Sequence, residues 1–480
     1  MDRFNPVLAV IVLLFTTVAN GQSATTFLKK AIAANGHWEY IRAFDYATQR
    51  TSYNRWQGYS FDRVQPETDA YEVYVDLEHH RHRHHTLAHY PGGYVFNTVR
   101  ISRDSGYYVY DLSLWRTGKA LLQVSGDLWR VNEHIIRTSF PYFILKDVLE
   151  SGDSLQFQTG KKEITIRRLT TTGTQELRFQ PKTLLLTRNT ITAGSSKRAQ
   201  HFDAYTNMAG AYRIPGAMTL RQDGQVVFKD VLIRFQPLPA ADTSQFSFPD
   251  GYTLQKDTSP PLSARAIAKD IYLVEKVDGD RNVLFINLND QVLVTEAPVS
   301  GNVTREIIRL IHQTLPGKKI GYVHLSHFHN DHIAGVMELV KEGAVILCTP
   351  SMEKPVREMI AATNGNQAGS VHPAFNFFNG HKILEDSHHR VELFEVPNSH
   401  AQGLSFLYLP REKLIYEGDL LSMPEDATVT PAFQVSLEFY HYLQKHQIVF
   451  GQIIGHHGLA RITPELFQQT MNAANTTNPK

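Results

Sequence analysis

One stretch constrains the fold of this chain more than any other: an apolar, β-prone run that leads into a loop of metal-binding side chains. Residues 320–325 form the run, and His327, His329, Asp331 and His332 follow closely. Side chains two residues apart in an extended loop lie on one side, so His327 and His329 can share a metal ion. A turn can direct Asp331 and His332 toward a second ion. Burying these groups unpaired is costly, and a metal satisfies them together, so this stretch alone indicates either a metal site or a solvent-exposed polar loop. The motifs that follow in the chain favour the metal site.

The spacing His327-x-His329-x-Asp331-His332 resembles the signature of the metallo-β-lactamase superfamily, and further motifs follow in the order that the family has. Each consists of an apolar strand followed by a histidine or an aspartate in a loop. The resemblance covers roughly residues 266–475. The motifs are residues 396–400, which end in His400, residues 414–419, which end in Asp419, and residues 453–458, which contain His456, His457 and Gly458.

The resemblance implies a set of ligands for two metal ions. The closing ligand is either His456 or His457, and the position of the His-Gly pair after the strand favours His457. Glu296 stands where the family usually has an aspartate, and we expect it to support the site without binding metal. Two Zn²⁺ ions are expected from the histidine and aspartate ligands, with iron or manganese as alternatives. The first ion would take His327, His329 and His400, the second Asp331, His332 and His457, and Asp419 would be shared between them.

The family resemblance also implies hydrolysis of a small-molecule substrate. A water that bridges two Zn²⁺ ions loses its proton near neutral pH and becomes the nucleophile. Asp331 would orient this nucleophile and accept a proton. The bond cleaved would be of the ester, lactone, thioester or phosphoester type. True β-lactamases of the superfamily lack the bridging aspartate, so Asp419 argues against that activity.

The N-terminus predicts export. Residues 7–18 form an apolar run too short for a membrane span, Arg3 precedes it, and small residues at positions 19 and 21 allow cleavage before Gln22. This pattern is typical of a secretory signal peptide over residues 1–21. We therefore expect a secreted or periplasmic protein with no membrane span after cleavage.

The length of 480 residues predicts two domains, and the near balance of 48 basic and 47 acidic residues argues against a general nucleic-acid partner. Neither length nor composition indicates an oligomeric state. Residues 22–236 are expected to form the first domain. It begins with a helix over residues 24–34, continues with short β-prone segments and has a second helical stretch around residues 131–149. These patterns predict a mostly antiparallel β-sheet domain.

A histidine- and arginine-rich segment, residues 78–85, is the most unusual feature of this first domain. As a strand it would place His80, His82 and His84 on one face. Adjacent imidazoles can bind a metal or an anion. Since no carboxylate or cysteine accompanies them at metal-binding spacing, we assign them to a sheet face or a solvated stripe.

Residues 237–264, rich in proline, serine and threonine, are expected to connect this domain to the second, over residues 265–480. There, strands and helices alternate, including an amphipathic helix over residues 302–313. The predicted fold class is α/β: a C-terminal α/β/β/α sandwich, as the family resemblance also implies, preceded by the antiparallel sheet domain.

A binding protein is the competing interpretation. The N-terminal sheet would then carry a lipid or another apolar ligand in the periplasm, and the metal domain would be non-catalytic. The complete set of ligand side chains argues against this interpretation, because a domain without catalytic demand tends to lose such residues.

Overall fold

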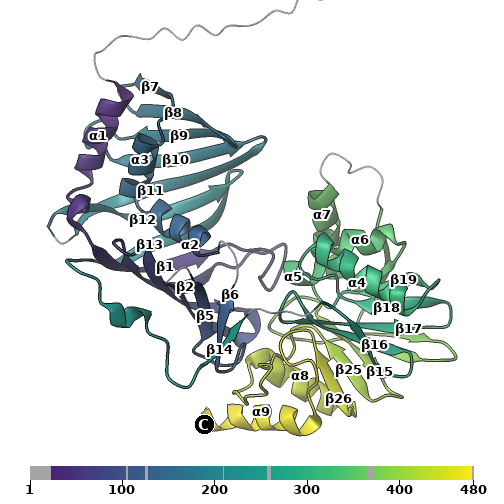
Figure 1. The fold of residues 1–480 in the computed structure, drawn as a ribbon. Coiled ribbons are helices and arrows are strands. Elements are labelled where there is room, and N and C mark those ends of the chain that lie inside the picture. Colours follow the sequence, from purple (N-terminus) through teal and green to yellow (C-terminus); the bar gives the residue numbers. More distant parts are fainter. Residues whose placement is uncertain are drawn as a thin grey trace, which may run out of the picture.

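The computed structural model describes residues 23–103, 106–124, 128–208, 210–256, 261–364 and 372–477. The expected signal peptide, residues 1–21, lies outside the described residues. No helix in these ranges is both long enough and apolar enough to cross a membrane. The chain folds into two β-rich halves that lie side by side, with the larger sheet formed by the N-terminal half (Figure 1).

The N-terminal half is a 14-stranded sheet in the order β14-β6-β5-β4-β3-β2-β1-β13-β12-β11-β10-β9-β8-β7. From β6 to β7 neighbouring strands are antiparallel, and β14 joins β6 in parallel. This confirms the predicted mostly antiparallel sheet. Its strands are β1 Ala43–Ser52, β2 Glu67–Asp76, β3 Arg81–Tyr90, β4 Tyr94–Arg103, β5 Gly106–Asp111, β6 Ala120–Val124, β7 Leu155–Thr159, β8 Ile164–Thr170, β9 Gly173–Phe179, β10 Leu186–Ala193, β11 Ser196–Met208, β12 Tyr212–Gln222, β13 Gln225–Leu238 and β14 Thr253–Lys256.

Three helices accompany this sheet: α1 Ala24–Ala34, α2 Leu128–Thr138 and α3 Pro141–Glu150. Both helical segments predicted from the sequence are therefore confirmed. Helices α1 and α3 cover one face of the strands from β7 to β12 (Figure 1). Ser23 caps the start of α1, because its hydroxyl accepts a hydrogen bond from the backbone N–H of Thr26. Short 3₁₀ turns add η1 Trp38–Tyr40, η2 Pro91–Gly93 and η3 Thr243–Phe246.

The histidine-rich segment 78–85 is only partly a strand. His80 lies in a turn with a φ of 53°, and β3 begins at the next residue. His82 and His84 are enclosed by the sheet, and burial lowers the pKa of His82 to about 4 and that of His84 to about 3. Both rings are therefore neutral at physiological pH. Among the described residues, groups of three or more metal-ligand side chains occur only in the C-terminal half.

The C-terminal half is an α/β/β/α sandwich, as predicted. Its first sheet has the order β15-β16-β17-β18-β19-β20-β21, and its second has the order β22-β23-β24-β25-β26. The strands are β15 Ala264–Ala268, β16 Ile271–Val277, β17 Arg281–Asn287, β18 Gln291–Thr295, β19 Lys319–His324, β20 Val345–Cys348, β21 Ala374–Phe377, β22 His381–Glu385, β23 Arg390–Glu395, β24 Ser405–Leu409, β25 Leu414–Glu417 and β26 Gln452–Gly455. The helices are α4 Gly301–Thr314, α5 Asn330–Ile333, α6 Val336–Lys341, α7 Glu353–Asn364, α8 Gln434–Lys445 and α9 Pro464–Thr477, with a 3₁₀ turn, η4 Pro350–Met352.

Strand β17 shows why these segments form buried strands. Its residues alternate between two cores: Leu284 and Ile286 pack between the sheets, whereas Val283 and Phe285 pack into the larger cluster that includes the helices. All four are fully buried. A strand covered on both faces must be apolar at successive positions, which is the pattern that the sequence shows.

The sandwich brings the predicted motifs together at one edge of its sheets. Strands β18 and β19 run in parallel, as do β25 and β26, and β23 and β25 both pair antiparallel with β24. The loops after β18, β19, β23, β25 and β26 therefore meet. These loops carry every residue that the family resemblance assigns to the metals.

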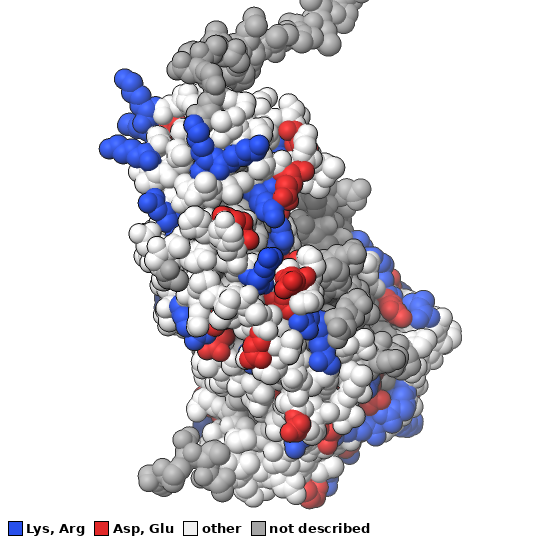
Figure 2. Space-filling view, turned by 60° about the vertical axis from the view of Figure 1, so that its left-hand side comes forward, with Lys and Arg blue, Asp and Glu red and all other residues white. Residues whose placement is uncertain are grey.

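The predicted connector, residues 237–264, lies between the end of β13 and the start of β15, and it contains η3 and β14. Strand β14 pairs with β6, so this part of the connector belongs to the large sheet. Figure 2 shows basic and acidic side chains interspersed over one face of the molecule, with the basic ones more numerous toward its upper end. This face has no continuous basic stripe of the kind that follows a nucleic-acid backbone.

Replacing Phe44 tests how much the aromatic core of the N-terminal half contributes to stability. Its fully buried ring packs among Trp38, Phe140 and Phe235, with ring centroids 5.5–5.8 Å away. Replacing a buried phenylalanine by alanine removes its apolar contacts and leaves a cavity, so Phe44→Ala should lower the free energy of unfolding by roughly 3–5 kcal/mol. Tyr40→Ala, at a side chain 72% exposed, is the control and should change it by less than about 0.5 kcal/mol. Urea unfolding followed by tryptophan fluorescence measures both, and equal effects would contradict this packing.

Candidate metal centre

The loop after β19 is held from both sides. The backbone N–H of Leu325 donates to the carbonyl of Leu347 in the neighbouring strand, and the N–H of Ser326 lies 3.3 Å from both carboxylate oxygens of Glu296. Helix α5 then turns the chain, with His329 at its N-cap position. The three histidines of the loop, His327, His329 and His332, have exposures of 1% or less.

A first group of ligand atoms is formed by His327, His329, His400 and Asp419, and these atoms all lie within 4.8 Å of one another. Oδ2 of Asp419 lies 3.5 Å from Nε2 of His327 and 3.1 Å from Nε2 of His400. Nδ1 of His329 is buried and makes no hydrogen bond among the described residues. Three imidazoles and one carboxylate oxygen therefore converge on one point.

A second group surrounds the other oxygen of Asp419. Its Oδ1 lies 3.1 Å from Nε2 of His332 and 3.4 Å from Nε2 of His457. Oδ2 of Asp331 lies 3.5 Å from Nε2 of His457 and 3.9 Å from Nε2 of His332. His456 belongs to the same neighbourhood, with its ring centroid 4.4 Å from that of His332.

Charge is concentrated in this buried site. Burial raises the pKa of Asp419 and Asp331, but the nearby imidazoles, His332 foremost, outweigh it and hold both carboxyl pKa values well below their ordinary range. Burial and the neighbouring His332 lower the pKa of His327 to about 4. Burial opposes protonation of His457 as well, but the carboxylates of Asp419, Asp280 and Asp331 raise its pKa to about 9. The site thus combines ionised carboxylates with imidazoles whose protonation depends on them.

Each histidine of the first group has its other ring nitrogen occupied. Nδ1 of His327 lies 3.0 Å from the Ser326 hydroxyl. The N–H at Nε2 of His329 donates to the carbonyl of Gly58 at 3.1 Å, and that at Nδ1 of His400 donates to the carbonyl of Pro91 at 2.8 Å. Because a carbonyl only accepts, these bonds place the ring proton on Nε2 of His329 and on Nδ1 of His400. The other nitrogens, Nδ1 of His329 and Nε2 of His400, lie on the side of Asp419, where Nε2 of His400 is 3.1 Å from Oδ2.

The two closing histidines differ in their surroundings. Nδ1 of His456 lies 3.0 Å from the carbonyl of Asn282 and 2.8 Å from the Tyr416 hydroxyl, and its Nε2 is buried without a hydrogen bond among the described residues. His457 instead has Nδ1 3.6 Å from Asp280 and Nε2 beside Asp331 and Asp419. His457 borders the cavity over the site, whereas His456 is fully buried behind it.

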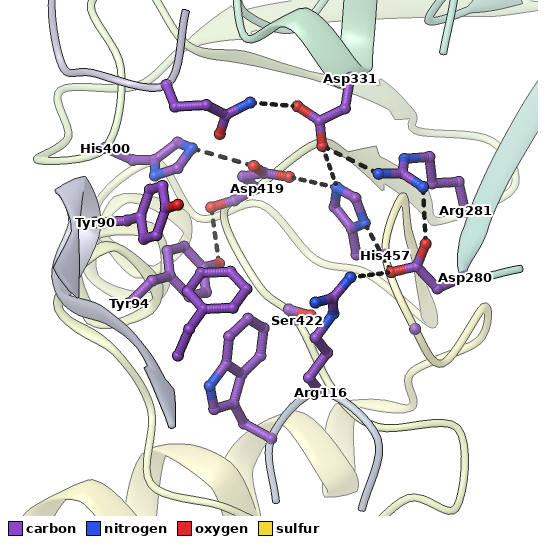
Figure 3. Close-up of a pocket in the computed structure, with 14 residues that line it drawn as sticks. Tyr90, Tyr94, Arg116, Asp280, Arg281, Asp331, His400, Asp419, Ser422 and His457 are labelled. Atoms are coloured by element: carbon purple, nitrogen blue, oxygen red, sulfur yellow. Dashed lines mark hydrogen bonds and ion pairs between the residues drawn. The ribbon is translucent and has the colours of Figure 1, made fainter. Parts of the chain in front are cut away.

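Residues of the N-terminal half contact the metal-binding residues from the side of the cavity. The side-chain amide of Gln57 donates to Oδ1 of Asp331 at 2.8 Å, and the Tyr94 hydroxyl donates to the backbone carbonyl of Asp419 at 3.0 Å. Burial raises the pKa of Tyr94 well above its ordinary value, so its hydroxyl stays protonated. A cavity of about 190 Å³ lies between the two halves. In Figure 3, Tyr90 and Tyr94 line one side of it, Arg116, Asp280 and Arg281 the other, and Asp331, Asp419 and His457 lie between them.

These residues fit metal ions. Nε2 of His327, Nδ1 of His329, Nε2 of His332 and Oδ1 of Asp419 are buried without a hydrogen bond among the described residues, although Nε2 of His332 and Oδ1 of Asp419 are only 3.1 Å apart. Unpaired nitrogen and oxygen atoms that lie this close together have the arrangement expected of ligands around a shared metal ion. Bonds of 2.0–2.1 Å in a tetrahedron place ligand atoms roughly 3.3–3.4 Å apart, close to most of the separations found in both groups.

The structure brings the other six sequence-predicted ligands together around Asp419, and Figure 3 labels three of these six beside it. Sequence reasoning missed the partners from the N-terminal half, Gln57, Tyr94 and the carbonyls of Gly58 and Pro91. It also missed Asp280, which faces His457. A backbone carbonyl leaves no signal in the side-chain sequence, and no local pattern links residue 57 to residue 331.

A family model described as the metallo-beta-lactamase superfamily matches residues 277–461. These residues form a metallo-beta-lactamase domain. It is preceded by the large N-terminal β-sheet region. No curated protein matches the chain.

Solved structures similar to part of this chain include two metallo-beta-lactamases. DIM-1 is 18% identical over 46% of this chain and 100% of its own, and FIM-1 from Pseudomonas aeruginosa is 19% identical over 45% and 96%. The flavodiiron protein from Giardia intestinalis is 14% identical over 45% of this chain and 60% of its own. The TM-score is 0.35 for each of the three.

Proposed function

We propose that this protein is a hydrolase that depends on two metal ions, with zinc as the metal that its ligands suit best. The first ion would be held by Nε2 of His327, Nδ1 of His329 and Nε2 of His400. The second would be held by Asp331, His332 and His457. The observation that carries the proposal is the position of Asp419, whose two carboxylate oxygens face different groups of imidazoles.

Two divalent cations bound there would supply Lewis acidity, which turns water into a nucleophile near neutral pH and polarises the bond under attack. The residues of the chain provide the geometry. Asp331, held by the Gln57 amide, orients the attacking water and accepts its proton. Asp419 fixes the spacing of the two groups of imidazoles. Gln57 and Tyr94 of the N-terminal half cover part of the site, and charges interact more strongly where the surroundings are less polar than water.

The substrate class that we propose is a small molecule with an ester, lactone, thioester or phosphoester bond. It has to enter a cavity of about 190 Å³ beside the metal ligands, which suits a small molecule. Export to the periplasm or medium stays a prediction from residues 1–21. A mature N-terminus at Gln22 in protein isolated from its host would test it.

Asp419→Ala tests the two-metal hydrolase directly. Losing the shared carboxylate should remove one of two zinc ions. It should also lower the rate of hydrolysis roughly 10- to 100-fold or more, since changes around metal ligands commonly have effects of this size. Elemental analysis gives the metal content, and a panel of ester, lactone, thioester and phosphodiester substrates gives the rate. The control Asp290→Ala removes an exposed carboxylate of the same domain and should leave both unchanged. Wild-type protein that binds no zinc after loading, or hydrolyses nothing in the panel, would refute the proposal.

Replacing His456 and replacing His457 by alanine should have different effects on zinc content. Nε2 of His457 lies 3.4–3.5 Å from oxygens of both carboxylates, while His456 forms no ion pair with either among the described residues. We therefore expect His457→Ala to lose the second zinc. His456→Ala should keep two zinc ions and unfold at a lower temperature, because it removes a buried ring bonded to Asn282 and Tyr416. The reverse pattern would assign the ligand role to His456.

The carbonyl bonds to His329 and His400 make the N-terminal half part of the metal centre. Acceptors of this kind fix the orientation of a ligating ring and raise its basicity. Pro91 belongs to η2, the tight turn between β3 and β4, where Gly92 and Gly93 have φ values of 87° and 81°. A Cβ on Gly92 would stand 3.0 Å from Cβ and 3.1 Å from Nδ1 of His400, and 3.1 Å from Cγ1 of Val435. The three atoms nearest to a Cβ on Gly93 all belong to Gln434.

Gly92→Ala and Gly93→Ala form a matched pair. Both place a side chain in the left-handed region at comparable cost, but only the first pushes against the ring of His400. Gly92→Ala should weaken zinc binding at the first site roughly 10- to 100-fold, and Gly93→Ala should bind zinc like the wild type. Competition with a chromophoric chelator measures both affinities. Equal affinities in the two variants would show that this turn does not hold the metal site.

A further inference from the structure

The cavity over the metal centre has one apolar side, and the N-terminal half supplies it. Tyr90, Tyr94, Phe96 and Trp115 line this side and together form what we call the aromatic wall. The metallo-beta-lactamase domain supplies Asp331, His400, Asp419 and His457 on the reactive side. The wall is therefore separate in sequence from the metal ligands yet next to them in space.

The rings of the aromatic wall pack against one another. Ring centroids of Tyr90 and Phe96 lie 4.9 Å apart, those of Phe96 and Trp115 lie 4.9 Å apart, and those of Tyr94 and Trp115 lie 5.3 Å apart. The indole N–H of Trp115 donates to the carbonyl of Val95 at 2.7 Å. Side chains fixed in this way lose little conformational freedom when a ligand arrives, so contact with them contributes efficiently to affinity.

Charged groups on the opposite side of the cavity are already paired. Asp280 lies 3.7 Å from Nη2 of Arg116 and accepts a hydrogen bond from Nη1 of Arg281 at 2.9 Å. Nη2 of Arg281 also lies 3.5 Å from Asp331. Because these charged groups pair with one another, the aromatic wall is the side of the cavity that an apolar part of the substrate, next to the bond cleaved, would contact.

We propose that the aromatic wall binds an uncharged, apolar group of the substrate, the size of a single aryl ring or a short acyl chain, next to the bond that is hydrolysed. An apolar cavity of about 150 Å³ binds benzene, so a cavity of about 190 Å³ has room for one such group. The proposal rests on the proposed hydrolase function, and it makes the N-terminal half the part that selects the substrate.

Binding of product-like probes to the zinc-loaded full-length protein tests this proposal without a known substrate. Acetate and phenylacetate present the same carboxylate and differ in the ring, and methylphosphonate and phenylphosphonate repeat the comparison for a phosphorus ester. Burying a phenyl ring contributes enough for a tenfold or greater gain in affinity. Isothermal titration calorimetry should therefore show the phenyl member of at least one pair binding at least about tenfold more tightly than its methyl partner.

Phe96→Ala should abolish most of that difference while leaving the methyl probe and the zinc content unchanged. Phe96 is only partly buried. Tyr90→Ala provides a second variant, since Tyr90 is also partly buried and lies at the end of β3. Phe375→Ala is the control: its ring is partly buried as well, but it stacks on Phe377 in β21 and does not line the cavity.

Failure of this inference and failure of the hydrolase proposal give different results. Zinc-loaded, hydrolytically active protein that binds phenyl and methyl probes equally would overturn the aromatic wall as a binding site. So would an unchanged preference in both Phe96→Ala and Tyr90→Ala. Protein that takes up no zinc would instead overturn the proposed function, together with the inference that rests on it.

Discussion

The carboxylate of Asp419 lies between two groups of buried imidazoles, and the rest of the site depends on that position. A carboxylate removed from water destabilises the fold by several kcal/mol unless it is paired and hydrogen-bonded. Here ring nitrogens surround it, and Nε2 of His327 and Nε2 of His332 have no hydrogen bond within the part of the chain that the structure describes. For these rings to face the carboxylate, each needs its second nitrogen anchored elsewhere. The contacts that anchor these rings therefore help to fix the position of the ring nitrogens around Asp419.

Some of these anchoring contacts come from the N-terminal half of the chain. Gly58 and Pro91 accept from the rings of His329 and His400, Gln57 donates to Asp331, and Tyr94 donates to the backbone of Asp419. The buried residues Phe61, Tyr94 and Trp115 also belong to the main core cluster of the C-terminal half. The large sheet is thus packed against the metal loop, and it contributes both to the orientation of the ligands and to the shape of the cavity.

The resemblance of the ordered motifs to the metallo-β-lactamase superfamily, together with the alternation of apolar strands and helices, predicted the C-terminal sandwich. The two segments predicted as helices in the N-terminal half were confirmed. The order of the 14 strands was out of reach, since pairing such as that of β1 with β13 joins residues almost 200 positions apart. The carbonyls of Gly58 and Pro91 were equally hidden, because a backbone acceptor can come from any residue type. His456 and His457 both stand at the closing position in the sequence, where the His-Gly pair favoured His457. In the structure Nε2 of His457 lies 3.5 Å from Asp331 and 3.4 Å from Asp419.

Anomalous diffraction at the zinc edge, from crystals of the zinc-loaded full-length protein, would test directly whether Asp419 is shared by two zinc ions. We expect two anomalous peaks, both within bonding distance of the Asp419 carboxylate. One should lie within bonding distance of Nε2 of His327, Nδ1 of His329 and Nε2 of His400, with Nδ1 of His400 still bonded to the Pro91 carbonyl. The other should contact Asp331, His332 and His457. A single peak, or two peaks that do not share Asp419, would contradict this expectation.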